Sequence, residues 1–176
     1  MVNNPDLSLR QIDNVRKKGL RPQVVACFIY EHKLLMVYKK KYDLWQLPQG
    51  GIDNNEYVEQ TLFREMKEEL GEKFIKQIDN RALYLGDDQI IFPPKTQGSR
   101  NLRTDAGKMV EMKGKKYYFY AIEANKPKID LRQSEFNDYK WVNYAQGINL
   151  AKTIYQKGKK RITLKALDLL KEQKII

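Results

Sequence analysis

The chain has 176 residues, with 33 lysines and arginines against 22 aspartates and glutamates and a formal net charge of +11. This length suits one domain with a sizeable core, and no apolar run is long enough to span a bilayer. The polar N-terminus lacks the apolar centre of a signal peptide. We therefore expect a soluble cytoplasmic protein that is a monomer, with no membrane or obligate protein partner. The basic charge would attract polyanions, although lysines spread along the whole chain also favour solubility alone.

The single cysteine and the single histidine exclude two kinds of site. Cys27 lies in an apolar run, where a buried structural role is expected, and it has no partner for a disulfide. His32 falls in a predicted surface turn. A mechanism built on a histidine base, or a histidine-rich zinc site, is therefore not expected.

The first half of the chain predicts a hairpin followed by a loop and a helix. Residues 1–19 form a polar arm ahead of a single domain over residues 20–176. Strands are predicted at 23–30 and 33–40, and Pro and paired Gly make 45–51 a loop. Apolar residues recur every four positions over 56–70, which indicates a helix; Asp53 and Glu56 form a possible capping box before it, and Gly71 ends it.

The second half predicts further strands, a long loop and a terminal helix. Short strand candidates lie at 82–85 and 89–92, and longer ones at 116–123 and 138–142. Residues 93–112 form a long polar loop, and residues 162–173 an amphipathic helix. Strands, one helix, more strands and a final helix predict an α+β or α/β/α sandwich layout.

Three carboxylates share one face of the predicted helix. Glu65, Glu68 and Glu69 are spaced by three and four residues, so they repel one another unless a cation lies between them. Hard oxygen ligands of this kind suit Mg²⁺ or Mn²⁺, which can neutralise and orient phosphate groups. A solvated charged face, with Arg64 and Lys67 in ordinary ion pairs, is the simpler interpretation of the helix alone.

The surrounding pattern decides between these interpretations. Residues 50–72 follow G-x5-E-x7-R-E-U-x-E-E-x-G-U, where U is a bulky apolar residue, and depart from it only at Glu72. This segment resembles the signature of the Nudix hydrolase family. The resemblance implies an α/β/α sandwich with a mixed central sheet, and metal-dependent hydrolysis of phosphoanhydride bonds.

The same resemblance implies a role for each matching residue. It implies metal ligation by Glu65, Glu68 and Glu69, and catalytic roles for Glu68, Glu65 and Arg64. Mg²⁺ would be the cofactor, with Mn²⁺ as a substitute and more than one ion when substrate is bound. Structural roles in the loop and helix fall to Gly50, Gly51, Glu56 and Gly71, with Arg64 pairing with Glu56.

Flanking segments resemble one branch of the family. Residues 20–24, 45–52 and 134–142 are similar to those of bacterial RNA 5′-pyrophosphohydrolases and asymmetric diadenosine tetraphosphate hydrolases. In that branch the residue matching Glu135 reaches the metal from a distant loop, and the one matching Arg21 contacts substrate phosphate.

Departures from the branch leave the substrate open. Residues 113–119 lack the glutamines that would read a base, and residues 158–161 lack a stacking ring, whose contribution is about 1–3 kcal/mol per base. Tyr42, Tyr117 and Tyr155 are candidate replacements, although strand or helix packing is the better explanation for each one taken singly. The candidate substrate contacts are Arg21, Lys39, Tyr42, Lys116 and Lys160.

Three hypotheses follow. Removal of pyrophosphate or stepwise phosphate from the 5′-triphosphate end of RNA is slightly favoured by the basic segments. Hydrolysis of diadenosine tetraphosphate or another dinucleoside polyphosphate is the close alternative. A nucleotide- or RNA-binding module without catalysis is the third, and the complete set of signature glutamates argues against it.

Overall fold

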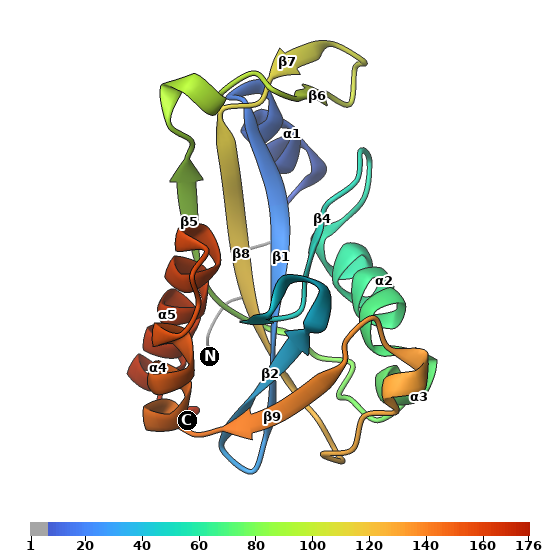
Figure 1. The fold of residues 1–176 in the computed structure, drawn as a ribbon. Coiled ribbons are helices and arrows are strands. Elements are labelled where there is room, and N and C mark those ends of the chain that lie inside the picture. Colours follow the sequence, from blue (N-terminus) through green and yellow to red (C-terminus); the bar gives the residue numbers. More distant parts are fainter. Residues whose placement is uncertain (1–6) are drawn as a thin grey trace.

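A mixed β-sheet forms the centre of the molecule (Figure 1). The structure, a computed structural model, describes residues 7–176. Strands join in the order β3-β2-β1-β8-β5, while β4 also pairs with β1 and β9 with β2. The strands are β1 (Leu20–Tyr30), β2 (Lys33–Lys39), β3 (Leu44–Gln46), β4 (Gln49–Gly51), β5 (Leu83–Ile91), β8 (Gly114–Glu123) and β9 (Asp138–Val142).

The two longest strands set the register of the site. β1 and β8 run parallel, with Leu20 opposite Gly114 and Ile29 opposite Glu123. Every other pairing in this sheet is antiparallel, including β1 with β4 and β5 with β8. The parallel pair makes Arg21 and Lys115 direct neighbours.

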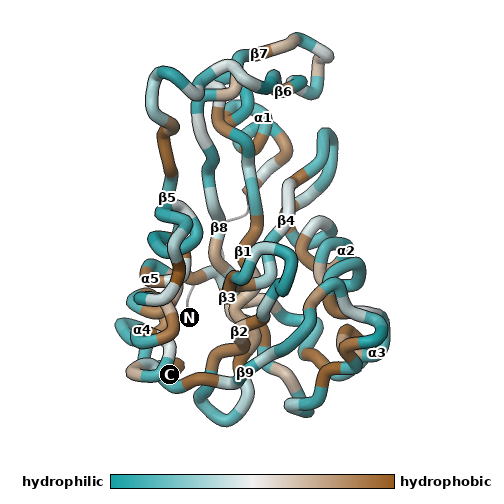
Figure 2. Tube along the Cα trace, viewed as in Figure 1, coloured by the Kyte–Doolittle hydropathy of each residue, from teal (hydrophilic) through white to brown (hydrophobic). Residues whose placement is uncertain are grey.

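Helices cover both faces of the sheet (Figure 1). One face packs against α2 (Val58–Leu70) and α3 (Glu72–Ile75), the other against α4 (Tyr144–Lys152) and α5 (Lys157–Glu172). Because side chains alternate along a strand, Val24 joins the first apolar cluster and Val25 the second. Figure 2 shows hydrophobic stretches along the strands and inner helix faces, and hydrophilic turns. The predicted α/β/α sandwich with a mixed sheet is confirmed.

Several elements differ from the sequence prediction. Helix α2 begins at Val58, two residues late, and α5 begins at Lys157, five residues early. The two short strands predicted at 82–85 and 89–92 are one strand, β5, with an irregularity between Tyr84 and Gly86. Helix α4 and the short helices were not predicted; the latter are α3, η1 (Lys40–Tyr42), η2 (Pro94–Thr96) and η3 (Leu131–Gln133).

The segment 93–112 is more ordered than the predicted loop. It contains a separate two-stranded hairpin, β6 (Asn101–Arg103) and β7 (Met109–Glu111), which extends beyond the end of the main sheet (Figure 1). Its strands are only three residues long and alternate exposed and half-buried side chains. Such short strands leave little periodic signal in the sequence.

A helix also forms within the predicted N-terminal arm. Residues 1–6 of that arm lie outside the described residues, but α1 (Leu9–Lys17) follows directly. Ser8 and Gln11 make a capping box at its start, and Ile12 and Arg16 are buried. Within residues 7–176, no helix has the length and apolar character needed to cross a membrane.

Candidate active site

The site is built on the close packing of strand β4 against helix α2. The backbone N–H of Gln49 donates a hydrogen bond to Glu69 Oε2 at 3.1 Å. A Cβ placed on Gly50 would lie only 2.1 Å from Glu65 Cδ. Only glycine therefore lets the strand pass this close to the glutamate helix. The contact places a row of backbone groups directly beside two signature carboxylates.

Arg64 connects the loop to the helix. Its Nε and Nη2 donate to the two oxygens of Glu56, both at 2.8 Å, and its Nη1 donates to Glu65 Oε1 at 2.7 Å. Nη2 also reaches the carbonyl oxygen of Gly51 at 3.2 Å. The hydrogen bonds from Arg64, helped by those from Thr61 and the Asp53 backbone, lower the pKa of Glu56 to about 2. Glu56 is thus a permanent anion that fixes the orientation of the guanidinium.

Two of the signature glutamates, Glu65 and Glu69, are partly buried in a way that disfavours their charged forms. Burial, together with the smaller effects of the Glu135 and Glu65 charges, raises the pKa of Glu69 to about 8, although the Gln49 N–H and the charge of Lys159 oppose the shift. Burial also raises the pKa of Glu65, although Arg64 opposes the shift. A divalent cation would reverse both effects, because hard carboxylate oxygens are its preferred ligands. The donor set of this face therefore fits Mg²⁺ or Mn²⁺.

These carboxylates are engaged by protein cations. Arg64 contacts Glu65 and lies 3.7 Å from an oxygen of Glu68, while Lys39 Nζ pairs with Glu135 Oε2 at 3.1 Å. Over residues 7–176, no three acidic, histidine or cysteine side chains already stand together as a metal site. A bound cation would therefore compete with the ion pairs that Arg64 and Lys39 make with these carboxylates.

The segment before β9 brings Glu135 to the end of α2. The backbone N–H of Glu135 and the hydroxyl of Ser134 both donate to the carbonyl oxygen of Glu69, each at 2.9 Å. Gly71, with φ +89°, lets the chain turn here; a Cβ on it would lie 2.8 Å from Gln133 Cβ. The last turn of α2 is therefore capped by the segment that carries the fourth predicted carboxylate.

Basic side chains from four elements lie near the glutamates or near one another. A Cβ on Gly51 would lie 2.7 Å from Arg21 Nη2, so this guanidinium lies against β4. Burial lowers the pKa of Lys115, and the charge of Arg21 lowers it further. Burial lowers the pKa of Lys159, at the start of α5, to about 8; Glu69 opposes the shift, whereas Lys115 and Lys39 add to it. The cluster Arg21, Lys39, Lys115 and Lys159 is thus a confined positive region beside the carboxylates.

Two predicted substrate residues lie elsewhere. Lys116 pairs with Asp87 and lies over the ring of Tyr118, on the sheet face that packs against α2, whereas Lys115 belongs to the other face. Lys160 lines a separate surface hollow with Asp88 and Arg161. In each case the preceding lysine, at 115 or 159, is the one that lies among the partly buried charges of the candidate site. Adjacent residues point to opposite faces of a strand and about 100° apart on a helix. Counting this alternation along β8 and α5 could have distinguished the two lysines of each adjacent pair.

Tyr42 lies at the outer edge of the site rather than inside it. Its side chain is exposed, and the hydroxyl of Tyr155, also exposed, donates to its backbone carbonyl oxygen at 2.7 Å. Lys41 lies over the Tyr42 ring. Tyr117, the third aromatic candidate, is buried in the cluster under α5. Of the three candidates, Tyr42 and Tyr155 therefore offer accessible rings.

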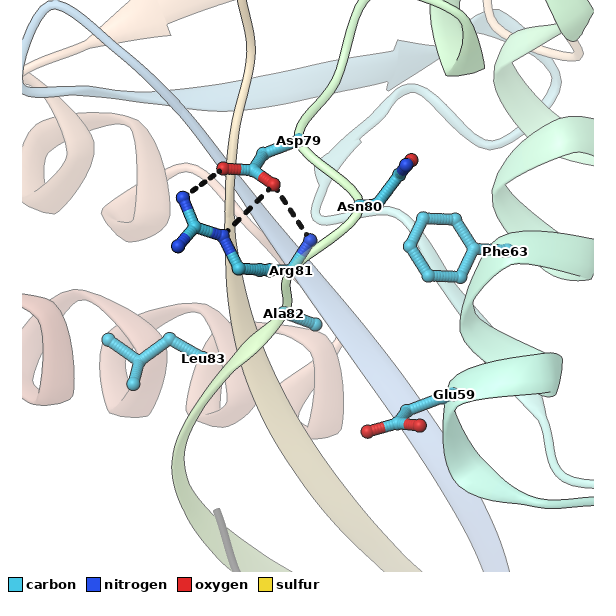
Figure 3. A pocket seen from close by; sticks show the side chains of 7 residues that line it. All are labelled: Glu59, Phe63, Asp79, Asn80, Arg81, Ala82 and Leu83. Atoms are coloured by element: carbon cyan, nitrogen blue, oxygen red, sulfur yellow. Dashed lines mark hydrogen bonds and ion pairs between the residues drawn. The ribbon is translucent and has the colours of Figure 1, made fainter. Parts of the chain in front are cut away.

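A pocket of about 560 Å³ lies on the other side of α2 (Figure 3). It is bounded by Glu59 and Phe63 from the helix and by residues 79–83. Its charged groups include Asp79, which accepts hydrogen bonds from Arg81. None of the signature glutamates lines it, so this pocket is distinct from the candidate site.

The comparisons with known proteins agree with this geometry. The NUDIX domain model matches residues 20–164. The chain belongs to the Nudix family. The resemblance inferred from the signature is therefore confirmed, and the protein is a Nudix hydrolase.

Named relatives cover most of the chain. An RNA pyrophosphohydrolase of Pasteurella multocida is 29% identical over 88% of this chain and 79% of its own length. One of Nitratiruptor is 34% identical over 74% of this chain and 82% of its own. Among solved structures, a MutT Nudix hydrolase from Burkholderia pseudomallei matches with a TM-score of 0.56 and 20% identity, covering 83% of this chain and 96% of that one. The structural match supports the fold alone.

The Arg64–Glu56 pair predicts a pH-dependent loss of stability. Replacing Glu56 with Gln should lower the free energy of unfolding by about 2 kcal/mol near neutral pH, because the guanidinium loses its charged partner. The pKa of Glu56 is about 2 in the folded protein, against an ordinary value of 4.5. Its stabilisation is therefore complete above the ordinary value and is lost as the pH falls towards the folded value.

Urea unfolding measures this effect at neutral pH and at a pH of about 3, where the difference between wild type and E56Q should shrink. Glu59→Gln, on the exposed side of the same helix, is the matched control and should change little. Equal stability of wild type and E56Q at neutral pH would contradict the assignment.

Proposed function

We propose that this Nudix hydrolase removes pyrophosphate from the 5′-triphosphate end of RNA with the help of Mg²⁺. The observation that carries the proposal is the positive cluster of Arg21, Lys39, Lys115 and Lys159 beside the signature glutamates. A triphosphate end carries several negative charges within a small volume, and confined cations favour such a group. The printed names of the Pasteurella and Nitratiruptor relatives point to the same substrate.

The glutamate helix would hold the metal. We assign Glu65, Glu68 and Glu69 as ligands and Glu135 as a fourth, with more than one ion when substrate is bound. Bound Mg²⁺ supplies charge neutralisation of the phosphates and a more acidic water. Arg64 would keep its two hydrogen bonds to Glu56 when Glu65 binds the ion. The assignment is supported by the signature spacing of these glutamates, and by the raised pKa of Glu65 and Glu69, because a cation would offset the burial that causes the shift.

The basic residues would position the phosphates for attack by water. Arg21 and Lys115 lie side by side on parallel strands and can bind neighbouring phosphate groups. Lys159 approaches from the opposite side, near Glu69, and would stabilise the charge that develops on the leaving pyrophosphate. Water adds across one phosphoanhydride bond, so the products are RNA with a 5′-monophosphate and free pyrophosphate.

Hydrolysis of a dinucleoside tetraphosphate is the second candidate. Tyr42 and Tyr155 are exposed by 45% and 62% and are joined by a hydrogen bond at the edge of the site. Such rings can stack on the first base of an RNA or on an adenine of a dinucleotide. The missing glutamines in residues 113–119 leave no side-chain amide there to distinguish one base from another.

Rates on the two substrates separate these candidates. With Mg²⁺, wild-type protein should release pyrophosphate from a triphosphorylated RNA with a kcat/KM about tenfold or more above that for diadenosine tetraphosphate. Glu69→Gln should abolish turnover of both, because it removes a carboxylate charge from the site. A higher kcat/KM for the dinucleotide would replace the first candidate with the second. Release from neither substrate would contradict both.

The lysine pair at the start of α5 provides a matched test of substrate binding. Lys159→Met should lower kcat/KM on triphosphorylated RNA by about tenfold or more, because a confined cation beside the phosphates is lost. Lys160→Met, which removes the same charge from the adjacent residue, should change kcat/KM by less than about threefold. Equal effects of the two substitutions in steady-state kinetics would mean that only the overall charge matters.

A further inference from the structure

The turn of the β6–β7 hairpin contacts the Nudix loop directly. Asp105, in this turn, accepts three hydrogen bonds on Oδ1. The donors are Asn54 Nδ2 at 2.8 Å, the backbone N–H of Asn55 at 3.2 Å and Arg16 Nη1 at 3.1 Å. Asn54 Nδ2 also donates to the carbonyl oxygen of Arg103 at 2.9 Å. One carboxylate oxygen therefore joins the hairpin to two consecutive loop residues and to α1.

Arg16 completes this connection from helix α1. Its side chain is 4% exposed, and its Nη2 donates to the carbonyl oxygens of Ile52 at 2.8 Å and Asp53 at 2.7 Å. A buried guanidinium is stable only when its N–H groups have hydrogen-bond partners. Here Nη1 and Nη2 find them in Asp105 and in the two loop carbonyls. The burial of Arg16 thus depends on the Nudix loop keeping its present path.

Helix α1 and the hairpin are also joined to each other. The backbone N–H of Asp105 donates to Asp13 Oδ1 at 2.7 Å, and Asp13 lies 3.9 Å from Arg16 Nη1. Figure 1 shows α1 lying directly below the hairpin at one end of the molecule, beside the loop that follows β4. Three segments far apart in the sequence meet at this point.

The Nudix loop is therefore held between two arginines. Arg64 reaches the carbonyl oxygen of Gly51 at 3.2 Å and the carboxylate of Asp53 at 3.4 Å from the α2 side. Arg16 holds the next two carbonyls from the α1 side. Between them Asn55 adopts φ +58°, a conformation that costs energy for a residue with a side chain. Contacts on both sides keep the loop in this shape.

We propose that Arg16 and Asp105 are positioning residues for the hydrolase reaction. They hold residues 52–55 so that Gly50 stays against Glu65 and Glu56 stays in reach of Arg64. The N-terminal helix and the hairpin, neither of which carries a signature residue, are then parts of the catalytic framework. The proposal rests on the hydrolase activity of the Nudix site and not on RNA being the substrate.

The test uses the full chain with Mg²⁺ and whichever of triphosphorylated RNA and diadenosine tetraphosphate the wild type hydrolyses. The variants are Asp105→Ala and the isosteric Asp105→Asn, which keeps an acceptor oxygen. Lys108→Ala, an exposed change in the same hairpin, is the matched control. Steady-state kinetics are combined with amide hydrogen exchange of residues 53–56 and of β1.

Asp105→Ala should lower kcat by about tenfold or more with KM within about threefold, and speed exchange in residues 53–56 but not in β1. Asp105→Asn should restore most of kcat, and Lys108→Ala should match wild type. Asp105→Ala with kcat within about twofold of wild type would overturn the proposal. A second contradicting result would be an Asp105→Asn variant whose kcat is as low as that of Asp105→Ala, although its residues 53–56 exchange as slowly as in wild type.

If Asp105→Ala yields no folded protein, Asn54→Ala provides the same test from the exposed side of the contact. It should lower kcat several-fold with KM unchanged and speed loop exchange. Faster loop exchange with wild-type kcat would overturn the proposal. Failure of the substrate assignment is a different outcome, because it changes which substrate the wild type hydrolyses and leaves the comparison of variants intact.

Discussion

The planar fork of Arg64 is the constraint on which the rest of the site depends. Two parallel hydrogen bonds to Glu56 fix its plane, and the remaining donors then reach Glu65 and the Gly51 carbonyl. A planar guanidinium can donate hydrogen bonds to these three partners at once only if each partner lies at a fixed position around it. The loop and the helix therefore cannot move independently. The close approach of Gly50 to Glu65 is a consequence of the same arrangement.

Opposite charges reach this framework from elements that are distant in the sequence. The parallel pairing of β1 and β8 sets Arg21 beside Lys115, and the start of α5 brings Lys159 towards Glu69. Burial shifts the pKa of Glu69 and that of Lys159 towards each other, to about 8 in both cases. In both groups burial disfavours the charged form, so an added opposite charge would stabilise it. A phosphate chain with its metal ions supplies both kinds of charge together.

The sandwich fold and the glutamate helix could be predicted from the sequence because both leave short-range patterns. The apolar spacing of α2 and the continuous apolar run of β1, which is buried on both faces, are visible within a dozen residues. The contributions of Lys115 and Lys159 are not, since a shift of one residue in a basic run moves the charge to another face. The Ser8–Gln11 capping box was a readable signal for α1. The contacts of Arg16 and Asp105 depend on long-range folding, and no local pattern indicates them.

The turnover of Arg64→Lys tests the central claim most directly. Lysine keeps the positive charge but has one ammonium group, which cannot donate two parallel hydrogen bonds to Glu56 and still reach Glu65 and Gly51. We expect Arg64→Lys to fold and to have a kcat with Mg²⁺ that is lower by about a hundredfold, the effect expected when catalytic groups are misplaced by about 1 Å. A folded Arg64→Lys variant with wild-type kcat would show that charge alone suffices, and would contradict the account.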